Sequence, residues 1–169
     1  ITATPALAAL RQRFPAAQID LLTTPAAAAA LPAGLVDRVL TAPRSLARRP
    51  GELPALLRLL ASLRQARYDA ALFLHHLTLG AGVAKYRLLA AATGAPLLLG
   101  LDNGKGGWLT HRVPDEGFGA WHEVEYWLQV VELLGAQTSD ARLRPCYSAT
   151  DLAAVTPLLA GLGPEPLVA

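Results

Sequence analysis

The 169-residue sequence contains no methionine and a single cysteine, Cys146. One cysteine cannot form a disulfide within the chain, so a disulfide-stabilised secreted domain is not indicated and the composition suits a reducing compartment. No apolar run reaches the roughly 18–20 residues that a bilayer span needs, because arginine, lysine, glycine or proline interrupts each one. We therefore expect a cytoplasmic protein that does not cross a membrane.

Charged residues are also scarce, at 17% of the chain, and the formal net charge is only +2. Basic residues are not interleaved with aromatic residues, and no helix-turn-helix or zinc-finger spacing occurs, so nucleic acid is not an expected partner. Hydrophobic residues, by contrast, make up 53% of the chain. This composition and length predict one domain with a substantial core.

Predicted helices and strands alternate along the chain. Apolar spacing and proline or glycine boundaries predict helices at 4–14, 25 to near 32, 52–67, 80–93, 120–134 and 149–162. Short apolar segments predict strands at 19–24, 35–41, 68–74 and 96–101. Alternation with short connections predicts an α/β fold, an open doubly wound parallel sheet with helices on both faces.

The two ends of the chain suggest a larger protein. The sequence opens on a helix, with Thr4 as the predicted cap and Pro5 at the first helical position. Because strand–helix alternation follows, we expect a first strand and its loop immediately before Ile1. Residues 137–145 look like a linker into the last helix. We therefore expect one Rossmann-like domain over 1–165 and the start of a second domain at 166–169.

Several short motifs occur in a recognisable order across nearly the whole chain. They are Thr4-Pro5-Ala6-Leu7, Arg13-Phe14-Pro15, Val36-Asp37-Arg38-Val39, Arg67-Tyr68-Asp69, Gly100-Leu101-Asp102, Thr110-His111-Arg112-Val113-Pro114 and His122-Glu123-Val124-Glu125. Each is weak alone. Together they resemble the N-terminal domain of the heptosyltransferase-like glycosyltransferases (family nine), which include the lipopolysaccharide-core enzymes.

The resemblance implies a GT-B architecture, in which two Rossmann-like domains face each other across a cleft. It implies inverting, metal-independent sugar transfer without a cofactor. The N-terminal domain would bind a saccharide or lipid-linked acceptor, and the absent C-terminal domain would bind the nucleotide-sugar donor. The family's catalytic aspartate is expected just before Ile1, so no residue of this chain inherits that role and the chain alone is expected to be inactive. A lipid-linked acceptor would bring the enzyme to the inner membrane face as a peripheral protein.

His75 and His76 follow the clearest predicted strand, at the edge where open α/β sheets bind ligands. Imidazoles there could bind sugar hydroxyls or assist a proton transfer. The alternative is a structural pair in which one ring caps the next helix. The predicted acceptor-binding set is His75, His76, Asn103, Lys105, Arg44 and Arg112.

The glycine-rich loop at 102–107 has three interpretations. Its backbone N–H groups could cradle a phosphate, although it lacks the ending of a P-loop. It could be a flexible loop, or a loop that faces the acceptor, with Lys105 and Arg112 near anionic groups. Trp108 beside it belongs either to the core or to a surface that stacks on a sugar ring.

Arg44 lies in a second arginine-rich loop with Arg48 and Arg49. That loop is either solvated or an anion site, because guanidinium groups match phosphate and carboxylate geometry. His111 and His122 lack the spacing of a known zinc site, and His122 near a helix start suits a structural role. We predict no metal site.

Two other classes of protein remain as alternatives. One is a stand-alone Rossmann or flavodoxin-like binding module; a receiver domain is disfavoured because only Asp102 lies at a strand end. The other is a nucleotide-dependent oxidoreductase fragment, which needs a glycine fingerprint after its first strand. The segment Thr2-Ala3-Thr4-Pro5 offers none of those glycines.

Overall fold

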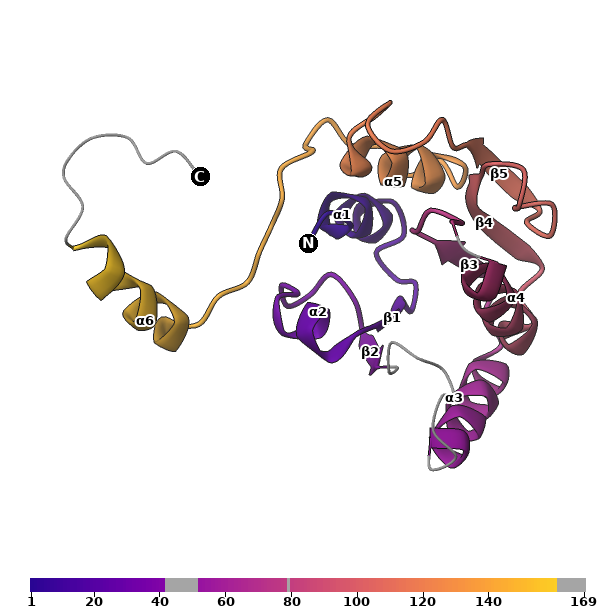
Figure 1. Ribbon diagram of the computed structural model, residues 1–169, viewed down its shortest axis with the longest axis horizontal. Coiled ribbons are helices and arrows are strands. Elements are labelled where there is room, and N and C mark those ends of the chain that lie inside the picture. Colours follow the sequence, from indigo (N-terminus) through magenta and orange to yellow (C-terminus); the bar gives the residue numbers. More distant parts are fainter. Residues whose placement is uncertain (42–51, 79, 161–169) are drawn as a thin grey trace.

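The computed structural model describes residues 1–41, 52–78 and 80–160, which form a mixed α/β fold (Figure 1). The helices are α1 (Thr4–Arg13), α2 (Pro25–Ala29), α3 (Leu53–Ala66), α4 (Gly80–Thr93), α5 (Glu123–Glu132) and α6 (Ala149–Leu159). The strands are β1 (Asp20–Thr23), β2 (Arg38–Thr41), β3 (Ala70–Phe73), β4 (Leu97–Asp102) and β5 (His111–Pro114). Each predicted helix and strand is present, with ends that shift by at most three residues.

The strands form two small parallel sheets, β1–β2 and β3–β4–β5. Their registers are set by the pairs Asp20↔Arg38, Ala70↔Leu97 and Leu99↔His111. The sequence does not predict β5, because this strand has four residues, ends in a proline and buries only Val113. Three adjacent parallel strands nevertheless carry the candidate site.

The predicted single sheet is not what the described residues form. Within residues 1–41, 52–78 and 80–160, β1 and β3 exchange no ladder hydrogen bonds, so the two sheets stay separate. A continuous sheet needs neighbouring strands about 4.8 Å apart along its whole width. The structure therefore supports the α/β class with parallel strands, and the doubly wound order stays a prediction.

Helices cover both faces of the β3–β4–β5 sheet. Leu72 packs against the core formed with α1 and α5, whereas the next residue, Phe73, meets Tyr86 of α4 with ring centroids 6.0 Å apart. Successive strand residues point to opposite faces, so α5 and α4 lie on opposite sides of this sheet. The predicted covering of both faces holds for these three strands.

The hydrophobic core lies where α1 and α5 run side by side over β4 and β5 (Figure 1). Its members include Ala6, Ala9, Leu10, Leu99, Leu101, Val113, Tyr126, Trp127, Val130 and Val131. The four from α5 recur at helical spacing and form one apolar stripe. This packing fixes the start of α5 next to the carboxyl end of the sheet.

Thr4 does not cap α1 as predicted. The helix begins one residue earlier, with Ala3 at the cap and no side-chain cap bond. The Thr4 hydroxyl instead donates to the Ile1 carbonyl oxygen at 2.8 Å and accepts from the Arg144 backbone N–H at 3.0 Å. Thr4 is buried, and it joins the start of the chain to the segment that follows α5.

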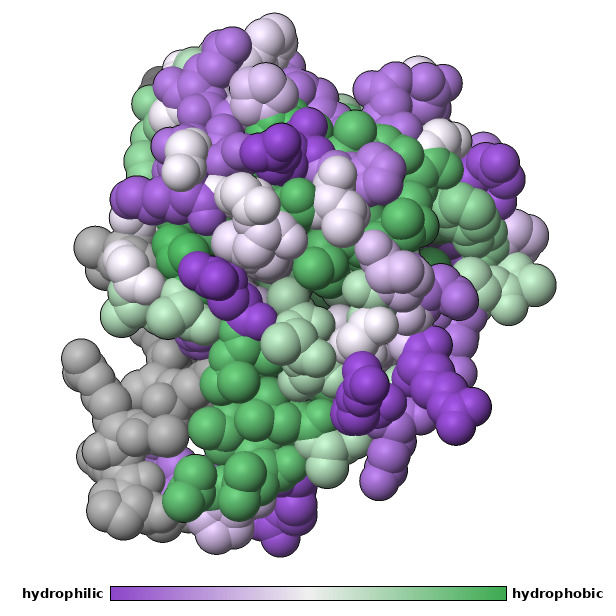
Figure 2. All heavy atoms as spheres, turned by 90° about the vertical axis from the view of Figure 1, so that its right-hand side faces the viewer, coloured by the Kyte–Doolittle hydropathy of each residue, from purple (hydrophilic) through white to green (hydrophobic). Residues whose placement is uncertain are grey.

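The leucine stripe of α3 buries less than its spacing predicts. Leu63 is buried, but Leu53 and Leu57 are 50% and 57% exposed. Figure 2 shows hydrophobic side chains gathered over α3 at the lower end of this face. Helical periodicity identifies an apolar face without showing what covers it.

The segment after α5 carries no helix or strand up to Ser148, as the linker prediction requires. Ser148 then caps α6 by accepting from the Asp151 backbone N–H at 3.1 Å. α6 stands away from the rest of the chain in Figure 1, and its described side chains are exposed. None of the described helices is long and apolar enough to cross a bilayer.

Tyr68 links the two sheets just before β3. Its hydroxyl donates to Asp20 Oδ2 at 2.5 Å, and Arg38 of β2 donates to the same carboxylate and to the Tyr68 oxygen. Burial opposes ionisation of Asp20, but the bonds from Tyr68, Arg38 and Gln18 outweigh it and hold the pKa below its usual value. One carboxylate therefore joins β1, β2 and the start of β3.

Replacing Tyr68 with phenylalanine is expected to lower the free energy of unfolding by about 1 kcal/mol at neutral pH. A lowered folded-state pKa stabilises the fold above the unfolded-state pKa, and that contribution is lost as the pH falls through the folded-state pKa. The difference between the wild type and Y68F should therefore shrink in acid. Urea unfolding at about pH 7 and about pH 3 measures it. Tyr147, which is 69% exposed, gives the control Y147F with no expected change; an equal Y68F effect at both pH values would contradict the role of Asp20.

Candidate functional site

Polar residues follow three adjacent strands at one edge of the sheet. His75 and His76 follow β3, Asn103 and Lys105 follow β4, and Asp115 directly follows β5. Because the strands are parallel, their carboxyl ends lie at the same edge, the usual ligand edge of α/β sheets. The structure thus brings four of the six predicted acceptor-binding residues to one edge and adds Asp115.

Asn103 and Lys105 both hold the segment that follows β3. The Asn103 side-chain amide donates to the Leu77 carbonyl oxygen at 3.0 Å, and the Lys105 ammonium donates to the Thr78 carbonyl oxygen at 2.5 Å. These bonds fix the chain directly after the two histidines. Lys105 itself stays exposed, so its charge is at the surface of the edge.

The two histidines lie on different sides of the sheet. The His75 ring is 5.1 Å from the ring of Tyr86 in α4, whereas the His76 ring is 5.5 Å from Trp127 in α5. Consecutive residues of an extended segment point to opposite faces, so the sequence pair does not form one paired site. Burial, with help from Lys85, lowers the pKa of His75 and favours its neutral form.

His76 is the buried member of the pair and forms a second pair with Asp115. His76 Nδ1 and Asp115 Oδ2 are 3.0 Å apart, and the two side chains are only 5% and 2% exposed. Three aromatic rings surround the imidazole: Phe118 at 4.6 Å, Tyr126 at 5.1 Å and Trp127 at 5.5 Å. A carboxylate can only accept a hydrogen bond, so this geometry places the imidazole proton on Nδ1.

The other ring nitrogen of His76, Nε2, is not used by the pair with Asp115. His76 Nε2 is buried and finds no hydrogen-bond partner among the described residues. In the neutral imidazole with its proton on Nδ1, Nε2 carries a free lone pair and can accept a proton or a hydrogen bond. A buried polar atom without a partner costs about 1–3 kcal/mol, so this arrangement is not explained by packing alone.

The start of the chain lies beside this pair. The indole N–H of Trp127 donates to Thr2 Oγ1 at 3.3 Å, and the Thr2 hydroxyl donates to Glu123 at 3.1 Å. Since Trp127 also contacts His76, residues 1–2 and the His76–Asp115 pair share one end of the fold.

Backbone N–H groups of the glycine-rich loop already bind a carboxylate, that of Asp102. Asp102 Oδ1 accepts the backbone N–H groups of Gly104 at 2.8 Å and Gly106 at 2.7 Å, and these bonds lower the pKa of Asp102. A Cβ on Gly106 would lie 2.9 Å from the Asp102 side chain, so only glycine fits there. The phosphate-cradle interpretation is therefore wrong for these two N–H groups.

Of the predicted arginines, Arg112 does not join the histidines. Arg112 lies in β5 and donates to Asp102 Oδ2 at 3.1 Å, with half of its side chain exposed. It supports the Asp102 loop rather than His76. Arg44, Arg48 and Arg49 lie outside the described residues.

His122 has the structural role that its position suggests. Its ring accepts from the Val124 backbone N–H at 3.2 Å, and Glu125 accepts from the His122 backbone N–H at 2.8 Å, which together cap α5. In residues 1–41, 52–78 and 80–160 no three His, Cys, Asp or Glu side chains gather in a way that could hold a metal ion.

Trp108 is a packing residue in this structure. Its ring meets Phe73 edge-to-face at 4.9 Å, and its indole N–H donates to the Lys105 carbonyl oxygen at 3.1 Å. It supports the loop that carries Lys105. Nothing here places it as a stacking platform for a sugar ring.

Sequence reasoning missed Asp115 and Phe118. The rule that identified His75 and His76, a polar residue just after a strand, also selects Asp115 once β5 is known. Phe118 lies between two glycines with positive φ, Gly117 at 96° and Gly119 at 90°. That Gly-Phe-Gly pattern was visible in the sequence but indicated no function without His76 beside it.

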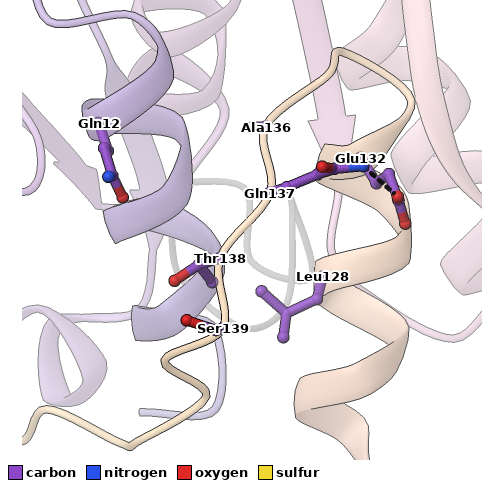
Figure 3. Close-up of a pocket in the computed structure, with 7 residues that line it drawn as sticks. All are labelled: Gln12, Leu128, Glu132, Ala136, Gln137, Thr138 and Ser139. Atoms are coloured by element: carbon purple, nitrogen blue, oxygen red, sulfur yellow. Dashed lines mark hydrogen bonds between the residues drawn. The ribbon is translucent and has the colours of Figure 1, made fainter.

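A separate pocket of about 570 Å³ opens at the other end of α1 and α5. Its lining consists of Gln12, Leu128, Glu132, Ala136, Gln137, Thr138 and Ser139 (Figure 3). Gln137 donates to Glu132 in its wall at 2.6 Å. None of the predicted site residues lines this pocket.

Comparison with known proteins adds no identification: the chain matches no protein-family model, no curated protein sequence and no solved structure.

Proposed function

We propose that the chain is the acceptor-binding half of an inverting glycosyltransferase of the heptosyltransferase-like type. This enzyme moves a sugar, heptose or similar, from a nucleotide sugar to a saccharide or lipid-linked acceptor. In this proposal the chain supplies neither the donor site nor the catalytic aspartate. The chain contributes the surface that orients the acceptor hydroxyl.

The observation that supports this proposal most is the convergence of three strand ends. His76, Asn103, Lys105 and Asp115 lie at one sheet edge, and the chain's start lies beside them. Imidazole, amide and ammonium groups together can accept from and donate to sugar hydroxyls. The same edge offers no phosphate cradle at the Asp102 loop, which suits an acceptor half better than a nucleotide-binding half.

The proposal includes one doubly wound sheet. β1–β2 and β3–β4–β5 would belong to the same sheet, with a further parallel strand between β1 and β3. The Asp20–Tyr68 bond supports this order, because it holds the start of β1 near the start of β3. Both sheets also consist of parallel strands only.

Binding of two ligand classes tests the proposal. Calorimetry on the chain should detect saccharides of the lipopolysaccharide-core type, whereas ADP- and UDP-sugars should bind no more tightly than roughly millimolar, about −4 kcal/mol. Replacing Lys105 with alanine should weaken saccharide binding by about 1–3 kcal/mol, since a charge-assisted bond is lost. Arg142, which is 86% exposed and bonded to Asp140 on the linker, gives the control R142A with unchanged binding.

Two results would overturn the proposal. Micromolar binding of a nucleotide sugar would place the donor site on this chain. Micromolar binding of a nicotinamide dinucleotide would favour the oxidoreductase alternative instead.

A further inference from the structure

We propose that His76 and Asp115 form a preset proton-accepting pair, covered by Phe118, that binds a neutral sugar hydroxyl once the cover moves aside. The ligand class rests on the proposed function. The geometry of the pair and of its cover stands independently of it.

Asp115 determines which nitrogen of His76 acts as the hydrogen-bond acceptor. This carboxylate uses Oδ2 for His76 Nδ1 at 3.0 Å and Oδ1 for the Gly117 backbone N–H at 3.0 Å. Both oxygens are therefore engaged, and the neutral imidazole is held in the tautomer with its proton on Nδ1. His76 Nε2 is then a hydrogen-bond acceptor, and its partner must be a hydrogen-bond donor.

The surroundings select a neutral donor. The aromatic rings of Tyr126 and Trp127 pack against the imidazole. The Tyr126 hydroxyl does not bond to it, because that hydroxyl is bonded to the backbone of residues 116–117. No charged side chain other than Asp115 lies within an ion-pair distance of His76 in the described residues. A charged ligand would lose its hydration here with little compensation, whereas a hydroxyl needs only one hydrogen bond.

Phe118 has the features of a cover. Its ring centroid is 4.6 Å from that of buried His76, yet the residue itself is 73% exposed, so the ring lies between the imidazole and solvent. Gly117 and Gly119 flank it with φ of 96° and 90°, and a Cβ at either glycine would meet nothing within 4 Å. The space beside the backbone on both sides of the ring is therefore open.

The cover is also anchored at its base. Tyr126 donates to the Gly117 carbonyl oxygen at 3.0 Å, and Trp121 donates to Glu116 at 3.1 Å. Phe118 can thus leave the imidazole while the segment on which it is carried stays attached to α5. Little core packing is lost when the ring swings outward.

Two measurements on the 169-residue chain test the cover and the pair. Diethyl pyrocarbonate, which acylates unprotonated imidazole, should modify His76 more than tenfold faster in F118A than in the wild type, as read by peptide mass spectrometry. Exposed His111 is the internal reference, and Y147A removes an exposed aromatic ring without touching His76. Equal His76 rates in F118A and the wild type would overturn the cover.

Nitrogen NMR of ¹⁵N-histidine reads the pair directly. His76 Nε2 should give the signal of an unprotonated nitrogen, and D115N should convert it to a protonated one, because an amide can donate to Nδ1. Methyl α-D-mannopyranoside, a neutral polyol probe, should shift the Nε2 signal in the wild type but not in D115N. Acetate, which cannot donate a hydrogen bond at neutral pH, should leave it unchanged.

The inference and the proposed function fail separately. A protonated Nε2 in the wild type, or no response to the glycoside, overturns the inference even if K105A weakens binding of core saccharides. Micromolar nucleotide-sugar binding overturns the proposed function even if His76 responds to the glycoside.

Discussion

Replacing Trp127 with alanine is expected to lower the free energy of unfolding by about 3–5 kcal/mol. The residue is 4% exposed and lies in the core between α1, α5 and the sheet. Truncation leaves a cavity and removes the indole bond to Thr2, so the start of the chain keeps only its bond to Glu123 among those from Thr2 to α5. Urea unfolding followed by far-ultraviolet circular dichroism measures the loss without depending on tryptophan fluorescence.

Trp121 provides the matched control. It is 47% exposed, and its indole N–H donates to Glu116 at 3.1 Å. W121A should lower the free energy of unfolding by less than about 1 kcal/mol, because removing an exposed ring leaves no cavity. Similar losses for W127A and W121A would show that the α1–α5 contact is not the main source of stability.

The secondary structure was largely predictable because local signals agree with tertiary packing. α5 is marked by apolar residues at helical spacing, and that stripe is the one that fills the core. Prolines and glycines delimit the neighbouring elements, so their ends shift by at most three residues. β5 escaped prediction because four residues ending in proline give no clear alternation.

Features that depend on distant contacts were not predictable. The spacing of Leu53 and Leu57 indicates an apolar face, but whether another element covers that face is decided by the rest of the fold. The separation of the two sheets was not predictable either, because local periodicity does not determine the order of strands in a sheet. The sequence therefore supported the α/β class more firmly than the single sheet.

The candidate site was predictable in position and less so in chemistry. The rule that polar residues after parallel strands meet at one edge placed His76, Asn103 and Lys105 together. It could not show that His76 pairs with Asp115, or that the Asp102 carboxylate occupies its own loop. Those facts depend on the direction of single side chains.

Replacing Asp115 with alanine is expected to lower the free energy of unfolding by about 2–4 kcal/mol. Two donors, His76 Nδ1 and the Gly117 backbone N–H, lose their acceptor at once. His76 is then a buried imidazole with no partner at either nitrogen among the described residues. The loss should be visible in urea unfolding and in faster amide exchange at Gly117.

The double variant H76L/D115A separates the pair from its surroundings. Leucine has no polar side-chain atom that needs a partner, and it can pack against the rings of Phe118, Tyr126 and Trp127. The double variant should therefore lose about 1–3 kcal/mol less free energy of unfolding than the sum of the two single losses. Strict additivity of the two single losses would mean that His76 and Asp115 do not act as a pair, and the buried acceptor would lose its physical basis.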